Sequence, residues 1–152
     1  TEMIPIILCL EQWILGQDIR MQEVLVDVKC FVDDCGYTSV WSQFGKELKE
    51  QFGMSEFPLL YTSSWLCGIL NGWTFQEASS LKQVKKSHLP MLFIHGEKDT
   101  YVPTSMVYEL YDAKPEPKEL WVVPEADHAK SYLLNREEYT EKVRQFTDKY
   151  MQ

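Results

Sequence analysis

The sequence predicts an α/β fold in which three to four parallel strands are flanked by helices. Two short apolar runs, Met91–Ile94 and Leu120–Val123, have the length of buried parallel strands. A third candidate strand, Val28–Asp33, comes earlier in the chain, and stretches with helical spacing separate the three. Strands and helices in alternation favour a parallel sheet with helices on its faces.

The length of 152 residues suggests a single domain. Residues 1–27 form an atypical segment within it. There, Met3–Leu10 is rich in isoleucine and leucine and fits a fourth strand, whereas Trp13–Val26 has a loosely helical period. Residues 28–152 hold the regular alternation of strands and helices, and they include a short helical insertion at about 38–86.

The insertion is predicted to contain two long helices. The first follows Gly36, with Thr38 or Ser39 as its N-terminal cap and Gly53 as its stop. Its apolar positions have helical spacing and are predicted to lie in the core: Val40, Trp41, Phe44, Leu48 and Phe52. The second, Phe57–Leu70, is apolar on every side, so it is expected to be buried or to cover a pocket or a partner.

Three further helices complete the predicted pattern. They are Ala78–Lys86 with Thr74 as a possible cap, about Thr104–Asp112 capped by Thr104 or Ser105, and about Arg136–Lys149.

Composition excludes several classes of partner. The net charge is −8 and no basic patch stands out, which argues against nucleic acid and against an anionic membrane surface. No apolar run reaches the ~20 residues of a membrane span, and no signal peptide is visible. The four cysteines, Cys9, Cys30, Cys35 and Cys67, do not have the closely paired spacing that is typical of metal ligands. We therefore expect reduced thiols in a cytoplasmic protein, without a metal or another cofactor.

The residues suited to chemistry follow the ends of two predicted strands. The strand at Pro90–His95 breaks at Gly96, and the loop after it carries Asp99. The next strand ends in a loop that carries His128. Because the carboxyl ends of parallel strands share one edge of the sheet, this edge collects ligands and catalytic groups. An acid and a histidine are therefore expected side by side.

These motifs resemble those of a known superfamily. The pattern strand–His-Gly-x-x-Asp-x-x-Val-Pro, followed by strand–loop–Asp-His, is similar to the C-terminal half of an α/β-hydrolase. Over Val28–Tyr150 the chain also resembles bacterial serine hydrolases of the esterase type, through Asp34–Val40 and Phe75–Ser79. The resemblance implies that Asp99 is the acid and His128 the base of a Ser-His-Asp triad. It also implies a partial hydrolase fold, without the N-terminal half of the sheet, and a small ester or acyl substrate.

Other residues near the motifs have simpler interpretations. Asp127 competes with Asp99 as the partner of the histidine, but it points away if His128 reaches inward. His95 is interpreted as a strand-end residue bonded to the backbone, and His88 as exposed. Ser131 is expected to cap or satisfy the histidine loop rather than to act as a nucleophile.

The nucleophile of the resembled family has no counterpart. That family needs Gly-x-Ser-x-Gly at a strained turn, whereas the corresponding stretch here is Leu10–Gly16, and no serine or threonine occurs between Met3 and Val28. Cys9 lies inside an apolar run and is interpreted as a core residue. The chain is therefore expected to lack esterase activity by itself.

Two functions stay open at this point. One is a serine hydrolase represented by its C-terminal half, and the other is a truncated, non-catalytic scaffold that binds a partner or ligand. An apolar sheet edge without its usual neighbour invites pairing with another chain. We therefore expect a homo-oligomer, a strand-exchanged dimer, or complementation by an N-terminal half.

Overall fold

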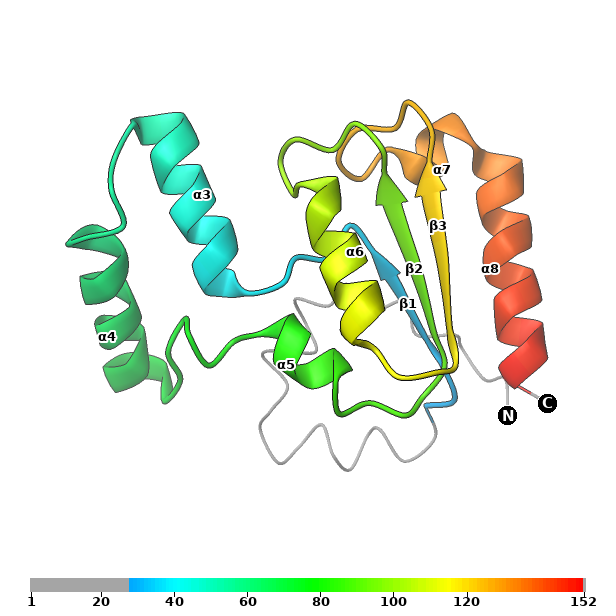
Figure 1. The fold of residues 1–152 in the computed structure, drawn as a ribbon, viewed down its shortest axis with the longest axis horizontal. Coiled ribbons are helices and arrows are strands. Elements are labelled where there is room, and N and C mark those ends of the chain that lie inside the picture. Colours follow the sequence, from blue (N-terminus) through cyan, green and yellow to red (C-terminus); the bar gives the residue numbers. More distant parts are fainter. Residues whose placement is uncertain (1–27, 152) are drawn as a thin grey trace.

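A computed structural model describes residues 28–151. Within this range, β1 (Phe31–Asp34), β2 (Met91–Gly96) and β3 (Lys118–Val123) form one parallel sheet in the order β1-β2-β3 (Figure 1). Phe31 is in register with Met91, which is in register with Lys118. The three predicted strands are thus confirmed, while the fourth, at Met3–Leu10, lies outside the described residues.

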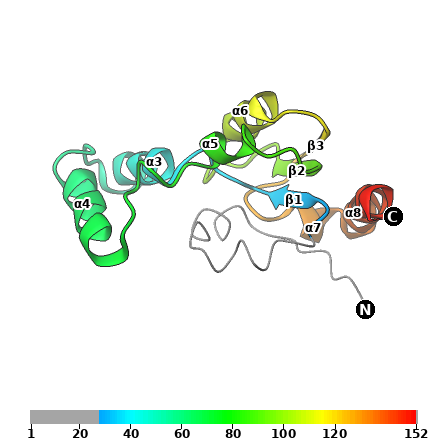
Figure 2. The same cartoon turned by 90° about the horizontal axis from the view of Figure 1, so that it is seen from below.

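Helices cover both faces of the sheet, and each face has its own apolar core. On one face, Val32, Leu92 and Ile94 pack with Phe146 of α8 (Arg136–Tyr150). On the other face, the side chains of Phe31, Met91 and Phe93 pack against α5 and α6. The bounds of these helices are Ser80–Val84 for α5 and Thr104–Ala113 for α6. Figure 2 shows α6 and α8 on opposite sides of the strands. The central strand β2 is fully buried because both of its faces are covered, whereas β3, at the sheet edge, is mostly half-buried.

The insertion forms a lobe beside the sheet (Figure 1). It consists of α3 (Val40–Phe52) and α4 (Leu59–Asn71). The hydroxyl of Ser39 caps α3 by accepting the backbone N–H of Ser42. Gly53 ends the helix in the left-handed conformation, with φ of 64°, where glycine avoids the Cβ penalty. These boundaries agree with the sequence.

The structure corrects the expected burial in this lobe. Val40 is buried, but Phe44 and Phe52 are exposed. Val40, in the first turn of α3, packs against buried Ala78. Further along the helix, Phe44 contacts Phe75 but borders an open hollow together with Phe52, so both stay exposed. α4 also differs from the expected buried helix, because only Leu60 and Ser64 of its residues are buried.

Two caps and one helix were also predicted incorrectly. Ser79, not Thr74, caps α5, while Thr74 binds the side chain of Glu77. Neither Thr104 nor Ser105 caps α6; the hydroxyl of Thr104 donates to the carbonyl of Gly96 instead. A short helix, α7 (Ser131–Leu134), precedes α8 and was not predicted. Within residues 28–151 no helix is long and apolar enough to cross a membrane.

Candidate active site

Asp99 lies on the loop between β2 and α6. Its residue is 4% exposed, and its Oδ1 accepts the backbone N–H of Val102 at 2.8 Å. The side chain of His95, at the end of β2, fixes the other side of this loop because its Nε2–H donates to the Val102 carbonyl at 2.9 Å. Val102 therefore bonds to the carboxylate of Asp99 through its N–H and to the ring of His95 through its carbonyl, which fixes the loop around the acid.

The loop that carries His128 runs beside the Asp99 loop. The backbone N–H of Glu97 donates to the carbonyl of Val123, at the end of β3, and the N–H of Lys98 donates to Ala126. Gly96 allows this close approach, since a Cβ there would lie 2.5 Å from the Ala126 carbonyl oxygen. Glycine at the end of β2 thus brings the two loops into direct contact.

The two predicted site residues meet across these loops. Nδ1 of His128 lies 2.8 Å from Oδ2 of Asp99. Because a carboxylate only accepts, Nδ1 of His128 carries the proton of this hydrogen bond. The side chain of His128 is 34% exposed, whereas that of Asp99 is fully buried. Within residues 28–151, Nε2 of His128 makes no hydrogen bond.

The lobe contacts the candidate site through Tyr101, which lies on the Asp99 loop. The ring of Tyr101 lies 4.8 Å from the ring of His128, centroid to centroid. Its backbone carbonyl accepts the side-chain amide of Gln43, in the first turns of α3, at 2.8 Å. Gln43 and Tyr101 therefore connect α3 to the ring of His128.

The alternatives weighed from the sequence are placed as follows. Oδ1 of Asp127 accepts the backbone N–H of His128 and its Oδ2 binds Lys130, so it faces away from the imidazole. His95 is buried and bonded to the backbone, and His88 is exposed, as predicted. Ser131 differs from the prediction, because its buried hydroxyl has no hydrogen-bond partner among the described residues.

A thiol network beneath the histidine loop was not predicted. Cys35 has φ of 60° just after β1. Its Sγ accepts the backbone N–H of Ala129 at 3.3 Å and donates to Oδ1 of Asp34 at 3.2 Å. Tyr139 of α8 donates to Oδ2 of Asp34 at 2.9 Å. Burial and the neighbouring Asp34 raise the pKa of the Cys35 thiol, so it stays protonated and can donate.

Asp33 is a second residue whose role the sequence did not indicate. It is fully buried, and neither carboxylate oxygen has a hydrogen-bond partner among residues 28–151. Burial, with a smaller contribution from Asp34, raises the pKa of Asp33 to about 8. An acid that lies without partners in an apolar interior is neutral at pH 7.

One group of side chains in the described range has donor atoms close enough for a metal ion. Ligand atoms of Cys35, His95 and Asp99 lie within 4.8 Å of one another. Each of these groups already has a protein partner: Ala129 and Asp34 for the thiol, Val102 for the imidazole, and Val102 and His128 for the carboxylate. Metal binding requires the thiolate, whereas the raised pKa of Cys35 favours the thiol. The donor set therefore fits a hydrogen-bonded support better than a metal site.

Comparison with solved structures defines the class of fold. The chain is similar to the Pyrococcus furiosus esterase Pf2001, with a TM-score of 0.59 and 23% identity, over 88% of this chain and 50% of that one. It is also similar to MGS-MChE2, an α/β-hydrolase enzyme from a lagoon-sediment metagenome, with a TM-score of 0.51 and 15% identity over 80% and 51% of the two chains. The fold is thus that of a partial α/β-hydrolase, as the sequence motifs predicted.

The family follows from the sequence comparisons. Residues 36–152 match the profile of the prolyl oligopeptidase family, and the chain belongs to that family. It is 31% identical over 118 residues to the uncharacterized protein YqkD of Bacillus subtilis (strain 168). That match includes 78% of this chain but 39% of the relative, so the chain spans about two fifths of the relative's length.

Proposed function

We propose that this chain carries the acid and the base of a serine hydrolase that acts on carboxylic esters or related acyl substrates. The observation that supports this most directly is the 2.8 Å contact between Nδ1 of His128 and a fully buried oxygen of Asp99. An acid in this position fixes the tautomer of the imidazole and stabilises its charged form. Nε2 of this partly exposed side chain would then face the nucleophile and the small-molecule substrate.

Each residue has a defined role in the proposed reaction. Nε2 of His128 accepts the proton of the attacking hydroxyl and later returns a proton to the leaving group. Asp99 stays ionised and holds the ring throughout. Backbone N–H groups would receive the oxyanion. The mechanism needs no metal or organic cofactor, and the chemistry resides in this chain's acid and base together with a hydroxyl from elsewhere.

The chain by itself is proposed to be inactive. Within residues 28–151 no serine, threonine or cysteine side chain bonds to Nε2 of His128, and Cys9 and the Leu10–Gly16 stretch lie outside the described residues. Loss of one triad member lowers turnover by orders of magnitude. This supports the second candidate function, a non-catalytic hydrolase-like scaffold that binds a ligand or partner. The reduced cysteines support a cytoplasmic location for either function.

An activity assay separates these two functions. The purified chain is expected to hydrolyse p-nitrophenyl acetate far more slowly than the ~1 s⁻¹ of a modest enzyme. We also expect that a fluorophosphonate probe does not label it. Turnover near ~1 s⁻¹, lost in His128→Ala, would overturn the inactivity and show that the nucleophile is present.

Proton NMR tests the acid–base pair independently of activity. We expect a downfield Nδ1–H resonance from His128 that disappears in Asp99→Asn and persists in Asp127→Asn. Asp127 is the matched control because it bonds only to the backbone N–H of His128 and to Lys130. If the resonance is absent, or survives in Asp99→Asn, then Asp99 is not the partner of His128.

A further inference from the structure

The most unusual surface of the molecule is the outer face of α4. Trp65 is 67% exposed and Leu70 is 70% exposed. The other large apolar residues exposed on this helix and just before it are Phe57, Leu59, Tyr61, Leu66 and Ile69. Monomeric proteins rarely leave a contiguous apolar patch of this kind uncovered.

The exposed residues share one side of the helix. At 100° per residue, Tyr61, Trp65 and Ile69 form one row, and Leu59, Leu66 and Leu70 form a second row beside it. The opposite side is already satisfied within the lobe, because the hydroxyl of Ser64 donates to the side chain of Gln76 and accepts the backbone N–H of Phe75. Two of the exposed residues also face α3, since the ring of Tyr61 lies 4.9 Å from that of Trp41 and Leu59 lines a hollow with Phe52. The other exposed apolar residues form the outer side of the helix.

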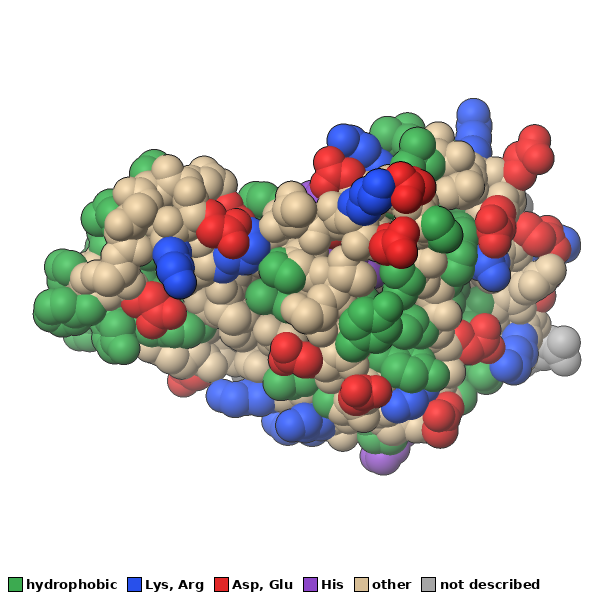
Figure 3. Space-filling view, turned by 45° about the horizontal axis from the view of Figure 1, so that its top comes forward, with side chains coloured by type: hydrophobic (Ala, Val, Ile, Leu, Met, Phe, Trp, Pro, Cys, Tyr) green, Lys and Arg blue, Asp and Glu red, His purple; other side chains and the backbone are tan. Residues whose placement is uncertain are grey.

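The position of α4 limits what could cover it. Figures 1 and 2 both place α4 at one end of the molecule, beyond α3 and opposite to α8. Hydrophobic side chains gather at that end of the surface (Figure 3). In both views the sheet edge at β1 lies away from this end of the molecule.

We propose that this outer face, consisting of Phe57, Trp65, Leu66, Ile69 and Leu70, joins two copies of the chain as a dimer. With ~200 Å² for a large apolar residue, the exposed fractions of these residues amount to roughly 600 Å² per copy, which is at the lower end of the area that each partner contributes to a specific interface.

Charge also favours a second copy at this face. Two copies each carry a net charge of −8 and repel one another elsewhere. α4 contains no charged residue between Leu59 and Asn71. A twofold pairing of α4 with its copy therefore brings apolar rows together without placing like charges opposite each other. The pairing at the sheet edge that the sequence suggests stays a separate prediction.

Sedimentation equilibrium over a range of protein concentrations tests this dimer. The unmodified chain is expected to be a dimer, and Trp65→Glu to raise its dissociation constant at least about tenfold, as for a central aromatic residue of an interface. Leu133→Glu is the matched control, since Leu133 is 75% exposed on α7 and outside the proposed face. Far-UV circular dichroism confirms that each variant is folded.

Disulfide cross-linking between two copies supplies a second test, with a smaller change to the surface than Trp65→Glu. Leu66→Cys, made together with Cys67→Ser, places a thiol near the middle of the outer face and should form an intermolecular disulfide in air. Leu133→Cys in the same background should not. A monomer at all concentrations, a dimer unaffected by Trp65→Glu, or equal cross-linking at both positions would overturn the proposal. A dimer unaffected by the glutamate would point to pairing at β1 instead.

Discussion

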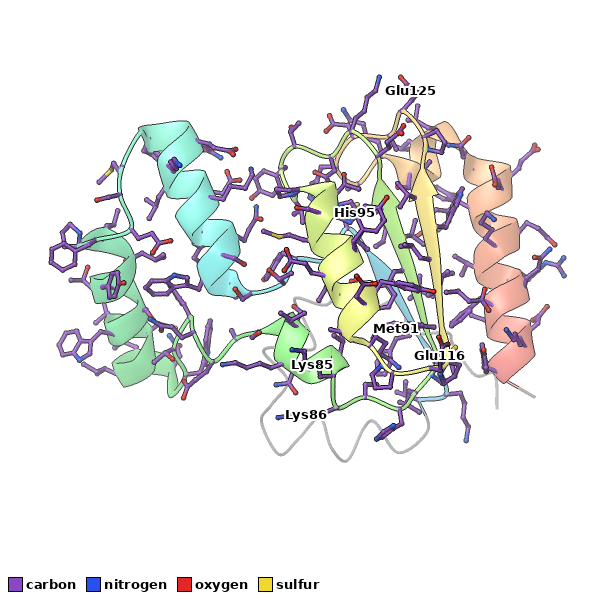
Figure 4. The ribbon with its side chains drawn as sticks, in the orientation of Figure 1. Lys85, Lys86, Met91, His95, Glu116 and Glu125 are labelled. Carbon is purple, nitrogen blue, oxygen red and sulfur yellow. The ribbon has the colours of Figure 1, made fainter. Side chains whose placement is uncertain are left out.

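The buried carboxyl group of Asp33 predicts an unusual dependence of stability on pH. In Figure 4, His95 marks the end of the neighbouring strand, β2, and Asp33 lies on β1, in register with Phe93. Gly36 packs directly against the carboxyl group of Asp33, and no hydrogen-bond donor of residues 28–151 reaches either oxygen. The folded protein therefore holds Asp33 in its protonated form at neutral pH, while the unfolded chain ionises it.

The sign and size of the effect follow from this difference. The pKa of Asp33 rises from 3.8 in the unfolded chain to about 8 in the folded protein. Between these values the folded state binds a proton that the unfolded state has lost, so stability falls as the pH rises from about 4 to about 8. Each pKa unit corresponds to about 1.4 kcal/mol, which gives an upper limit of roughly 6 kcal/mol. That is a large part of the ~5–15 kcal/mol of a typical domain.

The test compares Asp33→Asn with the unmodified chain in urea unfolding at pH 5 and pH 8. Asparagine cannot ionise, so the free energy of unfolding of the variant, relative to the unmodified chain, should increase by several kcal/mol between the two pH values. Any fixed cost of burying the amide cancels in this difference. Asp112→Asn is the control, because Asp112 is exposed. Protein concentration is held constant, because dimer formation would also change the apparent stability. If the stability of Asp33→Asn relative to the unmodified chain is the same at both pH values, the reasoning is refuted.

Two further predictions concern the loops that hold the candidate site. Gly96→Ala should destabilise the protein by about 1–3 kcal/mol, because the new methyl group meets the Ala126 carbonyl at 2.5 Å; urea unfolding beside Gly68→Ala, whose methyl would meet only a side chain, measures this. Cys35→Ala should leave the amide of Ala129 without its acceptor, at a cost of about 1–3 kcal/mol, and speed its hydrogen exchange. Cys35→Ser should restore part of the protection; equal exchange in all three proteins would exclude the thiol as an anchor.

The sequence was sufficient where a feature depends on a short stretch of chain. The apolar run ending at Gly96 predicted β2, and the glycine after Phe52 predicted the end of α3. Asp99 and His128 were found because each follows a strand directly. Parallel strands bring such positions together by geometry, so their contact needed no knowledge of the loops between them.

Burial in the lobe could not be read from periodicity. Helical spacing shows that Phe44 and Phe52 share a face of α3, but it does not show whether another element packs against that face. The same limit applies to α4, whose composition predicted a buried helix. Among residues 28–151, α3 and the Trp73–Phe75 segment pack against its inner side, and the outer side stays exposed.

The other features that the sequence did not predict depend on contacts between distant segments. The thiol of Cys35 bonds to an amide that lies 94 positions further along the chain, and no local pattern indicates such a pair. Asp33 was also hidden, since an aspartate in a strand normally indicates a solvent-facing position. Here the residue pairs with buried Phe93 instead. The one available signal was that Asp34 and Cys35 belong to a stretch that resembles the hydrolase family.

The contacts of the candidate site also bear on the choice between the two proposed functions. Val102 orients Asp99, and the bond from Lys98 to Ala126 fixes the histidine loop, so the acid–base pair is held entirely within residues 28–151. The side chain of His128 is partly exposed, and its ring lies beside that of Tyr101. A hydroxyl group brought to Nε2 by another segment or another chain would give the arrangement that the proposed hydrolase requires, whereas a scaffold that only binds ligands does not require a buried carboxylate bonded to the histidine.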